Sequence, residues 1–547
     1  MGNQGTQELP PGTVYLGNGH NDLNGVAQDS DGRIVLQPQP SNDPNEPLNW
    51  STGQKTITIT IACLFTLMVF TTINVGTITW PSLSEGLGYG TEYLNSSYAA
   101  GLAGLAVGCI IFIPLAVMVG RKPIYTFAAA VMVLVNVGQA TFQTRTQYLV
   151  IQVIGGLAGS VNDTIIQMTI MDLFFVHQRA TINGVYIIMV TMGGYLSAIP
   201  AGYIIESQGW RWVWWWCAIL NGVVLLLIVF AFEETRYTRD EGNAVVGEDD
   251  SIPAAPGDHN GSTKENSEIL ADSKLTVEEA EEPTMNTVHF PPRRSYVDRI
   301  TSIGPPPTLN IRAYWQHIWR PFLLLARIPA IPYVGLQYAL MLCWVAVLAT
   351  TQPILFAAPP YNFSSIGVGN INVAPFIGSV LGSVFGGPVN DYYVVWLARR
   401  RGGLYDPETR LHPLMVPLLI SPLGLFLYGI SIAAEKPWIV PLIGSGCVGF
   451  GIGATTSVIL PYYADSYREL VSEGFVVITV IRNTIATAMA FAISPWFLNL
   501  GVQRMLISAG CICFIILALT IPMIIWGRRA RQWTAEFYAN MVASHTP

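Results

Sequence analysis

Two ionisable residues stand inside long apolar stretches of this sequence, where charges are rare. Asp163 follows Asn162 in one stretch, and Arg482 precedes Asn483 in another. An ionisable side chain in the middle of a membrane-spanning helix costs about 2.5–3.5 kcal/mol on insertion scales, so such residues usually serve a function. Burial favours the neutral form of a carboxylic acid, which makes Asp163 the candidate site for a proton or cation. The alternatives are permanent pairing for Asp163 and a packing or gating role for Arg482.

The composition restricts the class of protein. The chain has 547 residues, of which 51% are hydrophobic and 12% are charged, whereas soluble domains carry about 25% charged residues. A net charge of −7 argues against a nucleic-acid partner. The seven cysteines lie in apolar stretches and favour no disulfide framework. No phosphate-binding loop, metal-ligand spacing or catalytic triad is present, so we expect a membrane protein that is not an enzyme and has no cofactor beyond a proton gradient.

Twelve apolar runs are long enough to cross a bilayer, arranged as six, a gap of about 95 residues, and six. The runs cover about 56–80, 95–118, 123–142, 148–171, 181–205, 212–232, 328–357, 366–390, 411–433, 438–464, 471–497 and 503–526. With the N-terminus inside, the inner segments hold 23 of the 28 lysines and arginines and the outer loops hold 4. This distribution predicts that both termini are cytoplasmic, and we expect the plasma membrane.

The same pattern divides the chain into segments. In chain order, five segments are predicted: a disordered cytoplasmic N-terminus (1–55), a six-helix bundle (56–237), a disordered acidic linker (238–308), an amphipathic helix with a second six-helix bundle (309–527), and a cytoplasmic C-terminal tail (528–547). Within the fourth segment, residues 314–320 have the pattern of a helix that lies on the inner leaflet.

Several short motifs accompany this layout. They are DPNEPLNWS at 43–51, GRKP at 120–123, GWRW at 209–212, FEETRY at 232–237, YADSY at 463–467, and Arg482 with Asn483. In this order the chain resembles the major facilitator superfamily, and more narrowly its fungal twelve-span drug:proton antiporter branch. The resemblance implies an all-α fold of two pseudo-symmetric six-helix bundles, a substrate cavity between them, and alternating access.

The chain departs from the family pattern in its first half. Ile113 and Val117 replace the glycine and aspartate that usually precede Gly120, and Gln152 stands where the family has an arginine. In the second half Gly387 and Asp391 match, although the basic run 399–401 comes later than expected, so the gate charge is expected mainly there. The export-linked pattern of the fifth span is only partly kept. Its residues here are Gly193, Gly194, Pro200 and Gly202.

Polar and aromatic residues in the spans are the candidates for the cavity, where aromatic rings can attract an organic cation. The set is Asn74, Trp80, Asn162, Tyr338, Trp344, Gln352, Asn370, Asn372, Tyr462, Arg482 and Asn483. The run 214–216, three tryptophans, is expected in the interfacial belt. Charged residues at the inner ends of the spans are the candidates for the gate, with solvated loop charges as the alternative. These are Arg121, Lys122, Asp172, Arg179, Asp391, Asp465 and Arg468. Sequons at Asn95 and Asn362 fall in expected outer loops.

Three functions remain open. We favour proton-coupled export of drugs or metabolites, with proton-coupled uptake of a cationic nutrient such as a polyamine as the alternative. A transporter-like membrane sensor is remote, because the segment after the last span has only about 20 residues. The expected partners are a small-molecule substrate and the lipid bilayer, without nucleic acid, and we expect the monomer to be functional.

Overall fold

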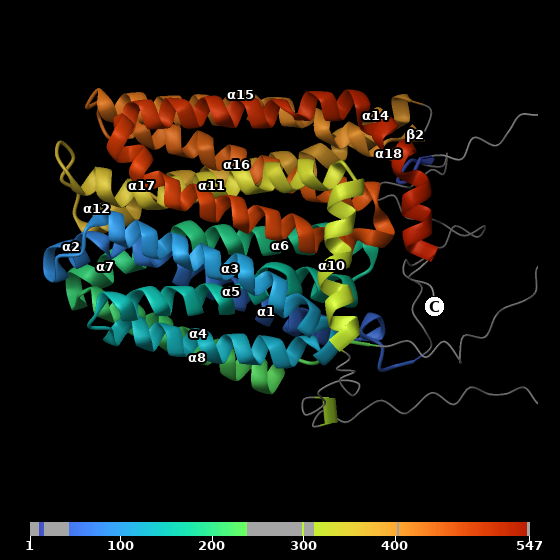
Figure 1. Cartoon of the computed structure of the whole chain (residues 1–547), viewed down its shortest axis with the longest axis horizontal. Helices are drawn as coiled ribbons and strands as arrows, with labels where there is room; N and C mark the ends of the chain where they lie inside the picture. The colour runs from blue at the N-terminus through green and yellow to red at the C-terminus, as the bar shows by residue number, and fades with distance from the viewer. Residues whose placement is uncertain (1–9, 16–42, 238–297, 300–310, 402–403, 544–547) are drawn as a thin grey trace, which may run out of the picture.

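The protein consists of long helices that run side by side, as Figure 1 shows for the computed structural model of the chain. The structure describes residues 10–15, 43–237, 298–299, 311–401 and 404–543. The predicted all-α membrane fold is confirmed, with one pair of two-residue strands besides. Most residues of the expected disordered N-terminus and central linker lie outside the described ranges.

The first bundle holds six spans and one short extra helix. Its elements are α1 (Thr52–Ile78), α2 (Trp80–Leu87), α3 (Thr91–Val119), α4 (Arg121–Thr141), α5 (Arg145–Leu173), α6 (Val176–Thr191), η2 (Met192–Leu196), α7 (Ala198–Gln208) and α8 (Trp210–Ala231). Helix α1 starts where the motif at 43–51 ends, because Ser51 and Gln54 form a reciprocal capping box. The fifth span was predicted as one helix, but the π-helical turn η2 at its paired glycines divides it into α6 and α7.

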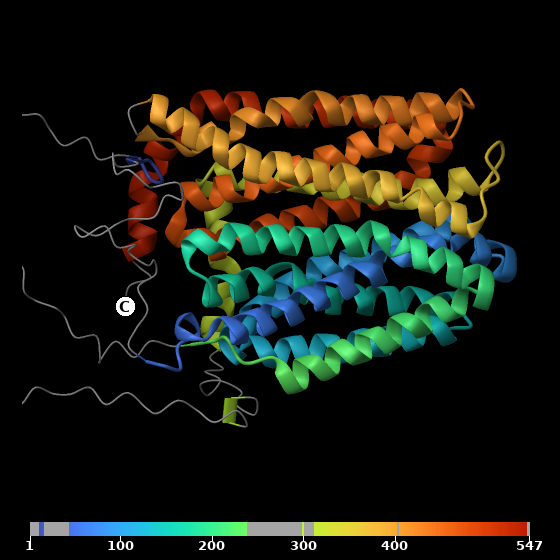
Figure 2. The same ribbon diagram turned by 180° about the vertical axis from the view of Figure 1, so that it is seen from behind.

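The second bundle repeats this plan. Its elements are α11 (Ala330–Ala357), α12 (Ser365–Asn370), α13 (Val373–Val384), η4 (Phe385–Val389), α14 (Asn390–Arg400), β2 (Leu404–Tyr405), η5 (Pro407–Leu414), α15 (Met415–Ala433), α16 (Ile439–Ser466), η6 (Arg468–Leu470), α17 (Val471–Ala518) and α18 (Thr520–Ala543). A π-helical turn, η4, again interrupts a span at paired glycines. The two bundles lie against each other with their helices nearly aligned (Figure 2).

Length and apolar composition identify eleven stretches of the described chain that could cross a membrane, one fewer than the twelve predicted. The last stretch, Glu473–Val542, is 70 residues long, which is far more than one crossing needs. Gly501 divides it, since its φ of 70° and ψ of 168° are not helical and a positive φ suits glycine. The chain therefore has its eleventh span before Gly501 and its twelfth after it.

Small residues set the distance between helices within each bundle. A Cβ atom on Gly156 of α5 would lie 2.8 Å from the carbonyl carbon of Gly101 in α3, a separation that real side chains do not tolerate. The glycine-rich stretch of α16 packs in the same way against α13. Glycines in spans two, four and ten thus allow close contacts between helices.

Both described ends of the chain lie at one end of the helices, which we call the terminal face (Figure 1). At the opposite end the bundles touch where α7 packs against α12 and where Asn95 of α3 donates to the carbonyl of Ala490 in α17. Nearer the terminal face, an apolar cluster of Cys109, Ile113, Met168 and Val480 joins α3 and α5 to α17. The two bundles are therefore in contact on both sides of the membrane-buried centre.

Helix α10 (Ile311–Arg327) lies across the spans near the terminal face rather than along them (Figure 1). It contacts α3 of the first bundle and α11 and α17 of the second. Trp315, Trp319 and Phe322 of this helix are 61%, 54% and 39% exposed, and their spacing places them on one face. The amphipathic helix predicted for residues 314–320 is thus present, with its apolar face uncovered by the described residues.

Candidate functional site

An ion pair joins the two bundles in the buried interior. The carboxylate of Asp163 in α5 accepts a hydrogen bond from the guanidinium of Arg482 in α17. The two residues are 5% and 4% exposed. Both residues were predicted separately from the sequence as the charges left in the spans. The structure brings them together across 319 residues of chain.

Further side chains hold both members of the pair. Asn483 donates from Nδ2 to Asp163 at 3.2 Å and accepts at Oδ1 from Arg482 Nε at 2.9 Å. Arg482 also donates to the hydroxyl of Tyr338 in α11 at 2.9 Å, and its guanidinium lies 4.8 Å from the centre of that ring. Cys109 of α3, which sequence analysis did not single out, accepts from Asn483 through its sulfur at 3.4 Å. We call Asp163, Arg482, Asn483, Tyr338 and Cys109 the charge centre. Its side chains come from four spans.

Asn162 faces the opposite way from its neighbour Asp163. Its Oδ1 accepts a 2.6 Å hydrogen bond from Thr66 of α1, while its Nδ2 has no partner among the described residues. Because Asn162 is fully buried, it links α1 to α5 beside the charge centre. It belongs to the framework that positions Asp163.

Three other predicted cavity residues, all in α1 or α11, are buried with polar atoms that lack partners in the described part of the chain. They are Oδ1 of Asn74 in α1, Nε1 of Trp344 in α11, and both amide atoms of Gln352 in α11. A buried polar atom without a partner costs about 1–3 kcal/mol. Such atoms are available to a bound molecule, and these come from the first span of each bundle.

The remaining cavity candidates lie elsewhere. Trp80 is buried among apolar side chains at the end opposite the terminal face, 6.3 Å from the ring of Tyr98. Asn370 is exposed, and Asn372 donates within its own helix segment. Tyr462 is buried in the apolar core of the second bundle near the terminal face. None of these four side chains contacts the charge centre in the described structure.

The three tryptophans at 214–216 differ from one another in burial. Trp216 is 41% exposed, as expected for the interfacial belt, but Trp214 is 1% exposed. A Cβ on Gly76 of α1 would lie 3.3 Å from the ring of Trp214. The expectation of a belt position for Trp214 was therefore wrong, because its ring fills the space beside that glycine.

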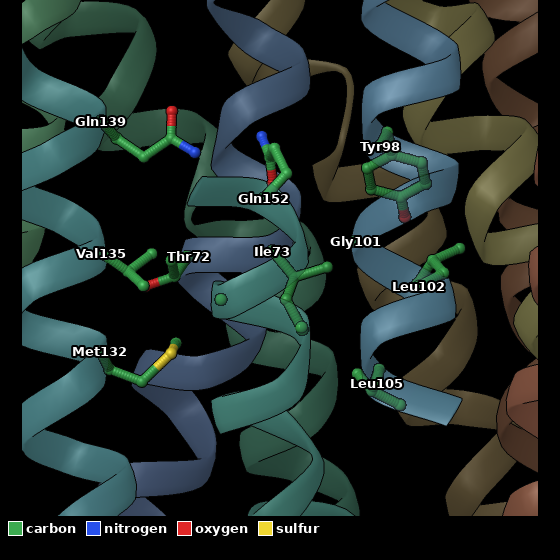
Figure 3. Close-up of a pocket in the computed structure, with 12 residues that line it drawn as sticks. Thr72, Ile73, Tyr98, Gly101, Leu102, Leu105, Met132, Val135, Gln139 and Gln152 are labelled. Carbon is green, nitrogen blue, oxygen red and sulfur yellow. The ribbon is translucent and has the colours of Figure 1, made fainter. Parts of the chain in front are cut away.

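A small cavity lies inside the first bundle, among α1, α3, α4 and α5 (Figure 3). The amide groups of Gln139 and Gln152 point toward one another at its rim (Figure 3), and Oε1 of Gln139 has no partner among the described residues. The cavity volume of about 20 Å³ suits one water molecule. Gln152 thus lines a water-sized space within one bundle.

Charged clusters close the ends of the spans at the terminal face. In the first bundle Arg121 pairs with Asp172 at 3.1 Å. Glu234, which follows the sixth span, accepts hydrogen bonds from the backbone N–H groups of Arg121 and Lys122 at 2.9 and 3.0 Å. A carboxylate at a helix N-terminus is stabilising, so Glu234 fixes the start of α4. The side chain of Arg179, at the start of α6, lies outside the described structure.

The cluster of the second bundle has a different cation from the one expected. Arg410 of η5 lies between Asp391 and Asp465, at 2.6 Å from each carboxylate. The hydroxyl of Tyr405 donates to Asp465 at 2.6 Å. Arg468, which sequence analysis placed in this gate, is exposed in η6. Arg410 was missed because it lies 19 residues beyond Asp391 in a connecting segment.

The two glycosylation candidates differ in accessibility. Asn95 is 3% exposed and bonds to the other bundle, so its amide is not available to a modifying enzyme. The expectation of a glycan at Asn95 is therefore incompatible with this structure. Asn362 lies in an exposed turn with a φ of 48°.

Comparisons with known proteins agree with the geometry. A family model described as Major Facilitator Superfamily matches residues 60–490. The chain is 32% identical to an uncharacterized MFS-type transporter of Schizosaccharomyces pombe, over 98% of this chain and 94% of that one. It is 29% identical to Protein HOL1 of Saccharomyces cerevisiae, over 97% of each chain. The fold is similar to that of the xylose transporter XylE from E. coli, with a TM-score of 0.57, 13% identity, and coverage of 86% and 98%.

Proposed function

The chain belongs to the major facilitator superfamily of membrane transporters, and we propose that it is a proton-coupled carrier of small organic molecules. The observation that carries the proposal is the buried pair of Asp163 and Arg482, which joins one bundle to the other. In an alternating-access carrier, the contacts between bundles must break and re-form during each cycle. A pair that one proton can neutralise couples this movement to the proton gradient.

The proposed coupling step is a change of partner at Asp163. Two opposite charges in a low-dielectric interior hold each other strongly, and removing one leaves the other uncompensated. A proton on Asp163 removes the negative charge that Arg482 faces, so the contact between α5 and α17 weakens. A cationic group of a substrate can likewise take the place of the guanidinium at Asp163. Proton and cation then compete for one carboxylate, which is the requirement for exchange.

The substrate is proposed to be a small organic molecule with both polar and apolar parts. The unpartnered atoms of Asn74, Trp344 and Gln352 supply hydrogen-bonding groups from α1 and α11. The ring of Tyr338 supplies an aromatic face beside the charge centre. Ligand sites in proteins commonly combine apolar walls with a few such polar groups.

We favour export of drugs or metabolites by antiport, and uptake of a cationic nutrient such as a polyamine by symport is the alternative. The excess of lysine and arginine on the terminal side supports a cytoplasmic terminal face. We propose that the protein resides in the plasma membrane and functions as a monomer. The clusters around Arg121 and Arg410 then act as the inner gates.

Transport in vesicles with an imposed pH gradient of either sign tests the proposal. Accumulation of a test amine or drug driven by protons moving in the opposite direction supports antiport, and accumulation driven in the same direction supports symport. Asp163→Asn should abolish the effect of the gradient at equal protein content. The matched control is Glu92→Gln, which makes the same kind of change at an exposed carboxylate of α3. Gradient-driven transport that persists in Asp163→Asn would refute the assigned role.

A further inference from the structure

The first described residues of the chain lie on the second bundle, although they precede the first span. We call residues 10–15 the docked segment. Within it, β1 (Val14–Tyr15) pairs antiparallel with β2, so that Val14 is opposite Tyr405 and Tyr15 is opposite Leu404. Pro10 and Thr13 are buried. This small sheet therefore joins the start of the chain to the connection between the eighth and ninth spans.

A buried cation holds the turn of the docked segment. Arg531 of α18 is fully buried and forms two hydrogen bonds to Glu408, at 2.8 and 2.6 Å. Its Nη1 donates to the backbone carbonyl of Pro11 and, at 3.0 Å, to the hydroxyl of Thr13. Thr13 in turn donates to Asp406 at 3.0 Å. The docked segment thus supplies acceptors to a guanidinium that no longer reaches water.

The backbone of the docked segment also fits the end of α16 closely. Gly12 has a φ of +80°, and a Cβ atom there would lie 2.9 Å from the Cα of Ser466 and 3.0 Å from its carbonyl oxygen. Both the backbone conformation and the space therefore require glycine. A larger residue at position 12 would separate the segment from α16.

The docking surface is continuous with the charged cluster of the second bundle. Tyr405, whose backbone belongs to β2, donates its hydroxyl to the carboxylate of Asp465. Arg410 donates to both Tyr405 and Asp465, at 3.1 and 2.6 Å. The docked segment touches the backbone at the end of α16 while β2 holds the Asp465 side chain. Docking and the intact cluster therefore stabilise one another.

The N-terminal segment, which we call the N-terminal tail, is also anchored to the first bundle, at the end that precedes α1. Asp43 accepts a 2.8 Å hydrogen bond from the hydroxyl of Tyr237, which follows the sixth span. The 27 residues between the two anchors can reach up to about 90 Å at 3.3–3.6 Å per residue. This length is too great to restrain the bundles as a taut tether. Any effect of the tail must come from the affinity of docking.

We propose that the terminal face of the second bundle carries a peptide-docking site, and that its ligand is the chain's own segment 10–15. The site consists of the edge of β2, the charged group of Asp406, Glu408 and Arg531, and the end of α16. It binds a peptide that turns at a glycine, carries a hydroxyl side chain at the next residue, and then pairs as a short strand with β2. Occupation of this site by residues 10–15 favours the intact Asp465 cluster. On the proposed function, docking of the segment therefore reversibly opposes opening of the gate at that cluster.

Binding of a peptide in trans tests the site with the full chain. The probe is a fluorescent peptide of residues 7–18. In the wild-type chain the tethered segment competes at an effective concentration of about 1 mM. Gly12→Val in the chain removes this competitor, so the probe should bind about tenfold more tightly than to the wild-type chain if its own Kd is about 100 μM. The matched control is Gly53→Val, at a glycine with no heavy atom within 4 Å, and it should behave as the wild-type chain does.

Two further results complete the test. A probe that itself carries Gly12→Val should not bind. In the Gly12→Val chain, Asp465→Asn should weaken binding of the wild-type probe by at least about fivefold, whereas Asp172→Asn, the corresponding change in the first bundle, should not. The proposal is overturned if the probe fails to bind the Gly12→Val chain, if the wild-type chain binds it equally well, or if Asp465→Asn leaves its affinity unchanged.

Discussion

Replacing one member of the buried pair should lower the free energy of unfolding. The loss should be larger for Asp163→Asn, which leaves the arginine, than for Arg482→Gln, which leaves the aspartate. Asp163→Asn leaves the guanidinium of Arg482 uncompensated, and its remaining hydrogen-bond partners among the described residues are the hydroxyl of Tyr338 and the amide of Asn483. A guanidinium does not lose its proton in proteins, so the charge persists. Arg482→Gln leaves a carboxyl group that a proton can neutralise.

The burial of the pair sets the size of the effect. With both side chains at most 4% exposed, loss of one partner of a buried pair costs about 3–5 kcal/mol. We assign this cost to Asp163→Asn. For Arg482→Gln the remaining cost is that of unsatisfied neutral hydrogen bonds, about 1–3 kcal/mol. The double variant Asp163→Asn with Arg482→Gln removes both charges and should be more stable than Asp163→Asn alone.

Thermal unfolding of the purified protein in detergent measures this order. One kcal/mol corresponds to about 2–4 °C for a cooperative unit of 150–250 residues. The expected loss in melting temperature is therefore about 6–20 °C for Asp163→Asn and about 2–12 °C for Arg482→Gln. Glu92→Gln should stay within about 2 °C of the wild type. The reasoning is refuted if Arg482→Gln is the more damaging single change, or if the double variant melts below Asp163→Asn.

Three other features give testable expectations. Gly156→Val should destabilise the protein by about 1–3 kcal/mol or more, since its side chain would collide with the backbone of α3, whereas Gly222→Val, in open space, should change the melting temperature by under about 2 °C. Asn95→Gln should not remove the mass of a glycan from the protein made in a glycosylating host, because the residue is buried; a loss of mass equal to one glycan would contradict this. Replacing Trp315 and Trp319 together by serine should preserve the melting temperature but reduce fluorescence quenching by brominated lipids, as exposed residues of a membrane-surface helix would; unchanged quenching would count against contact with lipid.

The fold could be predicted from the sequence because the bilayer imposes a local rule. About twenty apolar residues make a crossing, and the runs in this chain are separated by polar turns. The features that were missed depend on geometry at the turn itself. The division of a span at η2 and the two-residue strands β1 and β2 arise from tertiary contacts, which apolar periodicity does not record.

The candidate site was predicted as separate residues and not as an arrangement. The rarity of charge in the spans was enough to select Asp163 and Arg482, and the rule that buried charges pair could have joined them. The sequence carries no comparable signal for Arg410, since an arginine in a connecting loop looks like a solvated charge. Its position between two carboxylates becomes visible only when η5 is placed against α14 and α16.

The two charged clusters occupy corresponding places in the two bundles but differ in their partners. In each, an arginine beside the inner end of the bundle's third span pairs with an aspartate at the end of its fourth span, Arg121 with Asp172 and Arg410 with Asp465. The second cluster adds the carboxylate of Asp391, where the first bundle has the apolar Val117. The arginine of the second cluster therefore lies between two carboxylates, whereas the carboxylate of Glu234 in the first cluster accepts from backbone N–H groups at the start of α4. The docked segment packs against the end of α16 beside Asp465, so its affinity adds to the second cluster rather than to the first.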